Sequence, residues 1–108
     1  MSGECCLVVT TLDTKDAAVI LGRAAVEARL AACAQVVGPI SSVFWWKGGI
    51  EASQEWQCHL KTAATRFDAL RAFILERHPY EVPELVATPV VDGNPEYLEW
   101  IRTETTPV

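Results

Sequence analysis

The spacing of hydrophobic and polar positions changes several times along the chain, and each change predicts a new element of secondary structure. Short apolar or alternating runs are typical of strands, whereas apolar positions three and four residues apart are typical of helices. The strand pattern covers residues 5–11, 33–47, 50–62 and 84–91. The helical pattern follows Asp13, covers residues 66–78 and returns after Asn94. The predicted order of elements is therefore β-α-β-β-α-β-α.

The first predicted helix begins near two acidic residues. Asp13 is expected to be its N-cap, and Asp16 falls in its first turn, where the positive end of the helix dipole stabilises a negative charge. An apolar face then repeats at alternating steps of four and three residues: Ala17, Leu21, Ala24, Ala28 and Ala31. These small side chains predict close packing against a flat partner, most simply a sheet.

The two later helices have clearer ends. The apolar face of the second helix consists of Phe67, Leu70 and Ile74. This helix must end at His78, because Pro79 disfavours helical geometry in the residue before it. The C-terminal helix has Asn94 as its N-cap and Pro95 in its first turn. Its apolar positions are Tyr97, Leu98 and Ile101.

The two central strands are predicted to form a long hairpin. Gly38-Pro39 interrupts the first strand and predicts a bulge, because proline cannot donate to the hydrogen-bond ladder. Lys47-Gly48-Gly49 is a turn sequence, since glycine readily takes the positive φ of tight hairpins. In the return strand, Trp56, Cys58, Leu60 and Thr62 alternate with Glu55, Gln57, His59 and Lys61. This alternation predicts a sheet with one buried face.

With right-handed crossovers, the first six elements predict an α+β fold, the ferredoxin-like split β-α-β sandwich, in which two helices cover one face of a four-stranded antiparallel sheet. Pro89 places the last strand at a sheet edge. The 108 residues are expected to form one domain, spanning 1–108. The central hairpin is longer than a typical strand of about 5–6 residues and carries Trp45, Trp46 and Trp56. Because part of it must project beyond the helices, we expect a second copy of the chain to cover it in a homo-oligomer.

Composition narrows the classes of function. The chain has 14 acidic and 9 basic residues and a net charge of −5, which argues against nucleic acid as a partner, because binding a phosphate backbone needs a basic face. No apolar run reaches the roughly 20 residues needed to cross a bilayer, so no membrane association is expected. The chain opens without a basic segment followed by an apolar stretch, which predicts a cytoplasmic location.

The four cysteines are interpreted as small hydrophobic residues. Cys5 and Cys6 are adjacent and would point to opposite faces of a strand, and the sequence has no Cys-x-x-Cys spacing. Cys33 with His78 or His59 as base is one arrangement for a nucleophile, but its apolar surroundings predict a buried, inert thiol. The sequence also lacks the hydrolase, phosphate-loop and dinucleotide motifs. We therefore expect no enzymatic activity.

Five short motifs follow one another along the chain. They are Ala31-Ala32-Cys33-Ala34, Ser42-x-Phe44-x-Trp46-x-Gly48, Glu55 to Lys61-Thr62, His78-Pro79-Tyr80 with Pro83-Glu84, and Tyr97-Leu98-x-Trp100-Ile101. In this order and at this spacing they resemble the CutA (CutA1) divalent-cation tolerance proteins over roughly residues 7–102. The resemblance implies a ferredoxin-like subunit in a tight homotrimer, an architecture shared with the PII signalling proteins. It also implies a role in tolerance to copper and other divalent cations.

The resemblance further implies metal-binding positions. In some bacterial members, copper is bound by a Cys at the end of the first strand and by two consecutive His before Pro-Tyr. This chain has Thr10 and Arg77-His78 there, so only His78 matches, and one imidazole is too few for a selective copper site. The metal candidates are therefore His78 and the nearby carboxylates of Glu81 and Glu84, with a divalent metal such as copper as a cofactor that is not required. The structural alternative for His78 is a cation stabilised by the negative end of a helix dipole.

Five residues are candidates for an interface or cleft between subunits: Trp46, Glu55, Lys61, Tyr80 and Trp100. Glu55 and Lys61 share one strand face about 20 Å apart and cannot pair with each other, so we expect an ion pair across a subunit boundary or, alternatively, ligand binding. The tryptophans are interpreted as packing and interface anchors, and His59 as solvated or interfacial.

The sequence and the resemblance together leave two functions open. One is divalent metal tolerance through weak metal binding at inter-subunit clefts. The alternative is a PII-like signalling module that binds a small anionic ligand or a protein partner.

Overall fold

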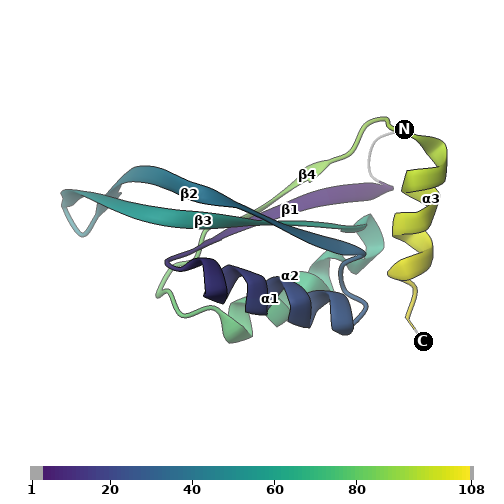
Figure 1. Cartoon of the computed structure of the whole chain (residues 1–108), viewed down its shortest axis with the longest axis horizontal. Coiled ribbons are helices and arrows are strands. Elements are labelled where there is room, and N and C mark those ends of the chain that lie inside the picture. Colours follow the sequence, from purple (N-terminus) through teal and green to yellow (C-terminus); the bar gives the residue numbers. More distant parts are fainter. Residues whose placement is uncertain (1–3, 108) are drawn as a thin grey trace.

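The computed structural model describes residues 4–107 as a four-stranded antiparallel sheet with helices on one face and a further helix at one end (Figure 1). Its elements are β1 (Cys5–Leu12), α1 (Lys15–Glu27), β2 (Cys33–Trp46), β3 (Gly49–Ala63), α2 (Phe67–Arg77), β4 (Leu85–Pro89) and α3 (Pro95–Glu104). A short 3₁₀ turn, η1 (Ala64–Arg66), leads into α2. The predicted order of elements is confirmed.

The strands of the sheet lie in the order β2-β3-β1-β4, so β1 and β3 are central and β2 and β4 are edges. β1 pairs antiparallel with β3 and β4, and β2 pairs antiparallel with β3. This arrangement is the ferredoxin-like split β-α-β sandwich, which confirms the predicted fold class. Pro89 ends β4 at a sheet edge, where a missing backbone donor is tolerated.

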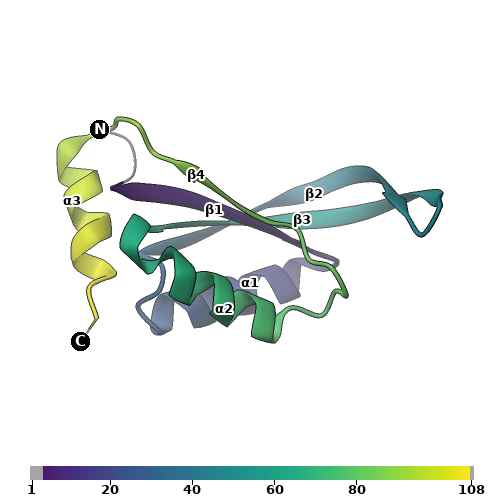
Figure 2. The same ribbon diagram turned by 180° about the vertical axis from the view of Figure 1, so that it is seen from behind.

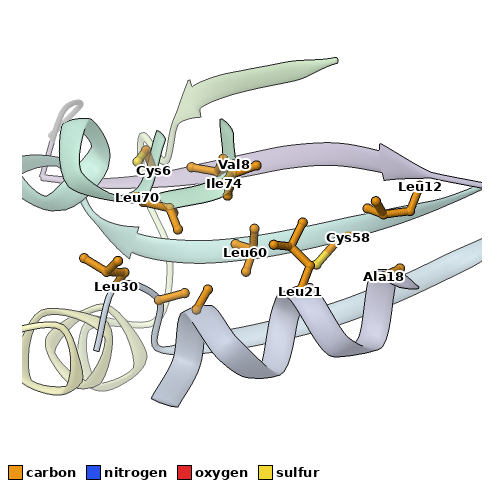
Figure 3. Packing of buried hydrophobic residues seen from close by; sticks show 12 residues of the cluster. Cys6, Val8, Leu12, Ala18, Leu21, Leu30, Cys58, Leu60, Leu70 and Ile74 are labelled. Atoms are coloured by element: carbon orange, nitrogen blue, oxygen red, sulfur yellow. The ribbon is translucent and has the colours of Figure 1, made fainter. Parts of the chain in front are cut away.

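The hydrophobic core lies between the sheet and the helices α1 and α2 (Figure 3). Val8 of β1, Leu60 of β3, and Leu70 and Ile74 of α2 are completely buried. The predicted alternation of β3 is confirmed by its buried Cys58, Leu60 and Thr62, but it fails at the start, where Glu55 is buried and Trp56 is only partly buried. Burying a large aliphatic side chain stabilises a fold by about 1.5–3 kcal/mol, so this layer supplies much of the stability of the chain.

The N-cap of α1 is Thr14, so the prediction of Asp13 is wrong by one residue. Thr14 has extended backbone angles, and its hydroxyl accepts a hydrogen bond of 3.0 Å from the backbone N–H of Ala17. A capping oxygen accepts from a backbone N–H two or three residues further along, and the hydroxyl of Thr14 does so with Ala17. Asp16 does occupy the first turn, as predicted.

The buried face of α1 also differs from the prediction. It consists of Ala18, Leu21, Gly22 and Ala25. Ala17 and Ala24 are only partly buried, Ala28 is exposed, and the buried Ala31 lies beyond the helix. Because alanines occur in adjacent pairs, the spacing of four and three residues fits two helix faces equally well, and the sequence pattern selected the wrong one.

Gly22 explains which face of α1 meets the sheet. A Cβ atom at this position would lie 2.7 Å from the Cβ of Ala34 and 3.1 Å from the Sγ of Cys58. Both distances are shorter than ordinary van der Waals contact, so only a glycine permits this approach of helix to sheet. The tight packing of α1 predicted from its small residues is therefore correct, although the contacting residues lie one position further along the helix than predicted.

The predicted hairpin is present, with strands of 14 and 15 residues. Lys47 and Gly48 form its turn with φ values of 50° and 85°, in agreement with the turn sequence. The predicted bulge is confirmed by a shift in register between Val37 and Ile40, where the Gly38–Pro39 peptide is cis. The distal half of the hairpin extends past both helices (Figures 1 and 2).

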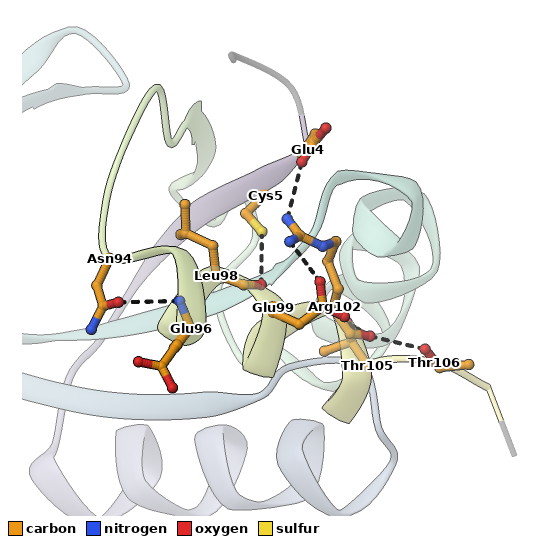
Figure 4. A network of polar contacts seen from close by, with 9 residues as sticks. All are labelled: Glu4, Cys5, Asn94, Glu96, Leu98, Glu99, Arg102, Thr105 and Thr106. Atoms are coloured by element: carbon orange, nitrogen blue, oxygen red, sulfur yellow. Dashed lines mark hydrogen bonds and ion pairs between the residues drawn. The ribbon is translucent and has the colours of Figure 1, made fainter.

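The C-terminal part also follows the prediction. The α2 helix ends at Arg77, and α3 is capped by Asn94, whose Oδ1 accepts a hydrogen bond of 3.1 Å from the N–H of Glu96. Ile101 anchors α3 against Cys5 and Ala32. Figure 4 shows Arg102, whose guanidinium contacts Glu4 at 3.0 Å and Glu99 at 2.9 Å. Within residues 4–107, no helix is long and apolar enough to cross a bilayer.

Candidate functional site

A groove of about 900 Å³ lies between the distal part of the hairpin and the loop that follows α2. The hairpin contributes residues 41–46, 51, 53 and 55, and the loop contributes residues 80–84. Thr11, near the end of β1, completes the lining. Five predicted site residues meet here: Trp46, Glu55, Tyr80, Glu81 and Glu84.

The groove forms here because β1 is shorter than β3. The last residue of β1, Leu12, pairs with Trp56, and in the structure of residues 4–107 no strand lies beside β3 on this side from Glu55 outward. The chain between α2 and β4 passes this end of the sheet (Figure 2). The groove therefore marks the point where the hairpin leaves the four-stranded part of the sheet.

Glu55 is the buried acidic residue of the groove, with only 7% of its surface exposed. Its Oε2 accepts a hydrogen bond of 2.9 Å from the hydroxyl of Tyr80. Burial and this hydrogen bond raise the pKa of Tyr80 well above its usual value. Within the described residues, no cationic side chain pairs with Glu55. A carboxylate that is largely shielded from water and accepts one hydrogen bond is costly to keep charged, which favours a cation from outside the chain.

The remaining charged groups of the lining are also acidic. Glu51, Glu81 and Glu84 join Glu55, and the lining contains no lysine or arginine. Lys47 at the hairpin turn lies beside the groove, with its Nζ 3.5 Å from Oε1 of Glu81. These carboxylates do not converge on one point: across residues 4–107, no three His, Cys, Asp or Glu side chains are close enough to hold one metal ion.

His78 lies next to the groove, but both nitrogens of its ring form contacts within the chain. It is 9% exposed, and its Nε2 lies 2.8 Å from the carbonyl oxygen of Thr11. Its Nδ1 accepts a hydrogen bond of 3.2 Å from the backbone N–H of Tyr80. Burial lowers the pKa of His78, outweighing the opposing effects of Thr11, Asp13 and Glu55. Burial favours the neutral ring, which argues against the alternative of a cation stabilised by the helix end.

The two other positions at which the family resemblance implies copper ligands do not suit a metal in this chain. Thr10 is fully buried, and its hydroxyl donates a hydrogen bond of 2.7 Å to the carbonyl oxygen of Glu84. The guanidinium of Arg77 lies over the ring of Phe73, 3.6 Å from its centroid. Copper prefers several nitrogen or sulfur ligands, and this set offers none that is free. The copper site implied by the resemblance therefore does not fit these residues.

Lys61 and Trp100 lie outside the groove lining. The Nζ of Lys61 donates a hydrogen bond of 2.8 Å to Oε1 of Gln35 and lies 5.8 Å from the ring centroid of Tyr97. Trp100 stacks on Tyr97, with ring centroids 5.6 Å apart. The five predicted cleft residues thus fall into two groups within one chain, one at the groove and one beside α3.

The thiol of Cys33, considered above as a nucleophile and expected to be inert, contacts no base among the described residues. Cys33 is half-buried rather than buried as expected, and its Sγ lies 3.6 Å from the hydroxyl of Tyr97. His59 contacts Oε1 of Gln57 at 3.0 Å, so neither histidine is engaged with this thiol. All four cysteines are free; Cys5, Cys6 and Cys58 are buried, as predicted, and burial raises the pKa of Cys58 to about 11.

Two groove residues of β3 were not among the predicted site residues. Glu51 and Ser53 line it together with Glu55. They lie four and two residues before Glu55 on β3, so the two-residue period of a strand places all three side chains on one face. The two-residue spacing from Glu55 was therefore the sequence signal that could have identified Glu51 and Ser53 as groove residues.

Comparison with known proteins places the chain in a family. The model of the CutA1 divalent ion tolerance protein family matches residues 6–104, and the chain belongs to this family. A Thermus thermophilus relative named divalent-cation tolerance protein CutA is 38% identical over 99 residues, which cover 92% of this chain and 96% of that protein. The mouse protein CutA is 45% identical over 85 residues, covering 79% of this chain and 48% of that protein. The chain thus spans about half the length of this mammalian relative.

Solved structures agree with this assignment. CutA from Xylella fastidiosa superposes with a TM-score of 0.92 at 38% identity, covering 95% of this chain and 99% of that one. A protein from Archaeoglobus fulgidus, named a periplasmic divalent cation tolerance protein CutA, superposes with a TM-score of 0.91 at 31% identity, covering 94% and 99% of the two chains. The expected family resemblance is confirmed.

Proposed function

We propose that this protein contributes to divalent-cation tolerance by binding a divalent cation weakly in the groove between the hairpin and the loop at residues 80–84. The single observation that carries this proposal is Glu55, a buried carboxylate whose one hydrogen bond within the chain comes from Tyr80. A cation would offset the cost of burying this charge. Relatives are named for the same role, including the Thermus thermophilus protein.

The chemistry of the lining also bears on the type of ligand. Four glutamates and no basic residue line the groove, so its field attracts cations and repels anions. This disfavours the alternative of a PII-like module that binds a small anionic ligand. Because carboxylate and hydroxyl oxygens prefer hard cations such as Mn²⁺ or Mg²⁺, these ions suit the groove better than copper does.

We propose that the working form is a homotrimer without enzymatic activity. The outer edge of β2 and the exposed Val43, Trp45 and Ile50 of the distal hairpin offer a surface that a second copy would cover. A neighbouring copy could also bring Lys61 and Trp100 to the groove, as expected of residues at an inter-subunit cleft. No cofactor is required for such binding.

We propose a cytoplasmic location and no nucleic-acid partner. The four free cysteines suit a reducing compartment, and the net charge of −5 opposes contact with phosphate backbones. The relative from Archaeoglobus fulgidus is named periplasmic, so cell fractionation is the direct check. Recovery of this protein in the periplasmic fraction would contradict the proposed location.

The test is a calorimetric titration of the metal-free protein with Mn²⁺, Zn²⁺ and Cu²⁺, with oligomer mass measured by light scattering. We expect binding that weakens at least about tenfold in Glu55→Gln, which corresponds to about 1.4 kcal/mol. The matched control is Glu76→Gln, because Glu76 is exposed on α2 away from the groove. Equal affinities of the two variants, or no binding by a confirmed trimer, would refute the groove as the cation site.

A further inference from the structure

The loop that closes the groove is fastened to β1 at both ends. At its start, the imidazole of His78 contacts the carbonyl oxygen of Thr11 at 2.8 Å. At its end, the hydroxyl of Thr10 donates a hydrogen bond of 2.7 Å to the carbonyl oxygen of Glu84. Both side chains are buried, so water competes little with either hydrogen bond. Two neighbouring residues of one strand therefore contact both ends of the loop, and the second contact lies next to the pairing of Thr10 with Leu85 in the sheet.

The contacts of His78 define its protonation state. The carbonyl oxygen of Thr11 can only accept a hydrogen bond, so Nε2 must carry the proton. The backbone N–H of Tyr80 can only donate, so Nδ1 must be unprotonated. The ring is therefore the neutral Nε2–H tautomer, and burial, which lowers the pKa of His78, acts in the same direction. Neither ring nitrogen remains available to a metal ion.

The same contacts determine where Tyr80 lies. His78 holds the backbone N–H of Tyr80, and the two rings meet edge to face with centroids 4.7 Å apart. From this position the hydroxyl of Tyr80 reaches Oε2 of Glu55. The side chain that meets the buried carboxylate is thus oriented by the histidine two residues before it.

We infer that His78 and Thr10 are positioning residues, which clamp the loop of residues 78–84 to β1 and thereby hold Tyr80 on Glu55, and that His78 does not ligate metal in this chain. The inference rests on the proposed function only in that this loop lines the proposed cation site. It assigns a shared role to two positions at which the family resemblance implies metal ligands, one of them matched by His78 and the other occupied by Thr10.

The first test measures the tautomer and the metal coordination of the His78 imidazole directly. In the intact protein at neutral pH, nitrogen-resolved NMR of labelled histidine should show His78 as the neutral Nε2–H tautomer, with His59→Gln used to assign the signals. Titration with Mn²⁺, Zn²⁺ or Cu²⁺ should leave both ring nitrogens of His78 without direct metal coordination. A protonated ring, the Nδ1–H tautomer, or a metal-bound nitrogen would each overturn the inference.

The second test measures the effect on Tyr80 without any metal. In a Tyr97→Phe background, the ring-carbon signal of labelled Tyr80 is followed during alkaline titration. Replacing His78 by Ala should release Tyr80 from Glu55 and move its pKa down towards the ordinary value of about 10. Thr10→Val should shift it in the same direction, whereas Thr10→Ser, which keeps the hydroxyl, should restore the parent behaviour. An unchanged titration in folded His78→Ala would refute the positioning role.

Two conservative variants separate the two contacts if His78→Ala fails to fold. His78→Gln can donate to Thr11 from a position like that of Nε2, and His78→Asn can accept from Tyr80 from a position like that of Nδ1. We expect Asn to preserve more of the Tyr80 shift than Gln does, and the reverse order would contradict the role of Nδ1. Because neither readout requires a bound cation, loss of cation binding alone would refute the proposed function and leave this inference intact.

Discussion

The two halves of the β2–β3 hairpin are continuous in both strands but differ sharply in burial. In the proximal half, Cys58 and Leu60 of β3 are fully buried beneath the helices. In the distal half, Val43, Trp45 and Ile50 are 71%, 73% and 64% exposed. The two halves belong to the same two strands, so the difference comes from what covers them.

This contrast separates stability from function within one element. The proximal half is held by apolar burial, which is the main driving force of folding. The distal half leaves that core and carries the groove, where polar and aromatic side chains remain open to a ligand or a second chain. A rigid base with a projecting functional segment is a common arrangement in proteins.

The largest effect is expected from truncating the core beneath the proximal half. Ile74→Ala should lower the free energy of unfolding by about 2–5 kcal/mol, because Ile74 is fully buried. Ile50→Ala, at the distal end, should change it by less than about 0.5 kcal/mol in a monomer. Urea denaturation with light scattering checks both. Equal losses would contradict the comparison, whereas a lower oligomer mass in Ile50→Ala would identify a second copy as its cover.

A smaller loss is expected at the contact between α1 and the sheet. Gly22→Ala would bring a Cβ atom within 2.7 Å of Ala34, so helix or strand must shift, at a cost of about 1–3 kcal/mol. Gly93→Ala is the control, because its Cβ would meet Leu98 at an ordinary distance of 3.5 Å. Thermal unfolding of both variants measures the difference. Similar midpoints for the two would show that the proximal packing is looser than described.

The start of α1 lies near the boundary between the two halves and tests the assignment of its N-cap. Thr14→Ala should cost about 1 kcal/mol, because it removes the oxygen that accepts from the N–H of Ala17. Asp13→Ala should have almost no effect on stability. A larger loss for Asp13→Ala than for Thr14→Ala in chemical denaturation would restore the sequence-based assignment.

The smallest effect is expected from His78 and depends on pH. Its pKa is lowered in the folded state, so the unfolded chain binds the proton more readily as the pH falls below about 6.5. The parent protein should therefore lose stability on acidification through this range, and above it this contribution should be constant. His78→Gln should show a flatter pH dependence of the urea midpoint, and His59→Gln should retain the parent slope. An identical slope in His78→Gln would argue against burial of the neutral ring.

The sequence predicted what repeats locally and missed what depends on distant contacts. The period of two in β3 and the turn at Lys47 and Gly48 were readable, because each depends on neighbouring residues alone. The face of α1 was not, because Gly22 acquires its meaning only against Ala34 and Cys58.

The candidate site in the groove shows the same division between features set by local sequence and features set by distant contacts. Glu55 and Tyr80 were both recognised as candidates, but their hydrogen bond joins residues 25 positions apart and has no counterpart in the local pattern. For His78, the position at a helix end suggested a cation, whereas burial favours the neutral form. Desolvation depends on how the whole fold surrounds the ring, which sequence spacing does not reveal.

The bulge in β2 also determines which side chains share a face with Glu55. Val37 pairs with Gln57 and Ile40 with Glu55, so three steps along β2 match two along β3. Beyond this point the even-numbered Ser42, Phe44 and Trp46 share the face of Glu55. If the same residues of β2 paired without this bulge, the odd-numbered set that includes Val43 and Trp45 would share the face of Glu55 instead. The set of side chains that the distal hairpin presents on the face of Glu55 thus depends on the register of β2. A family member with a different register would present the other set without any change in the side chains of the hairpin.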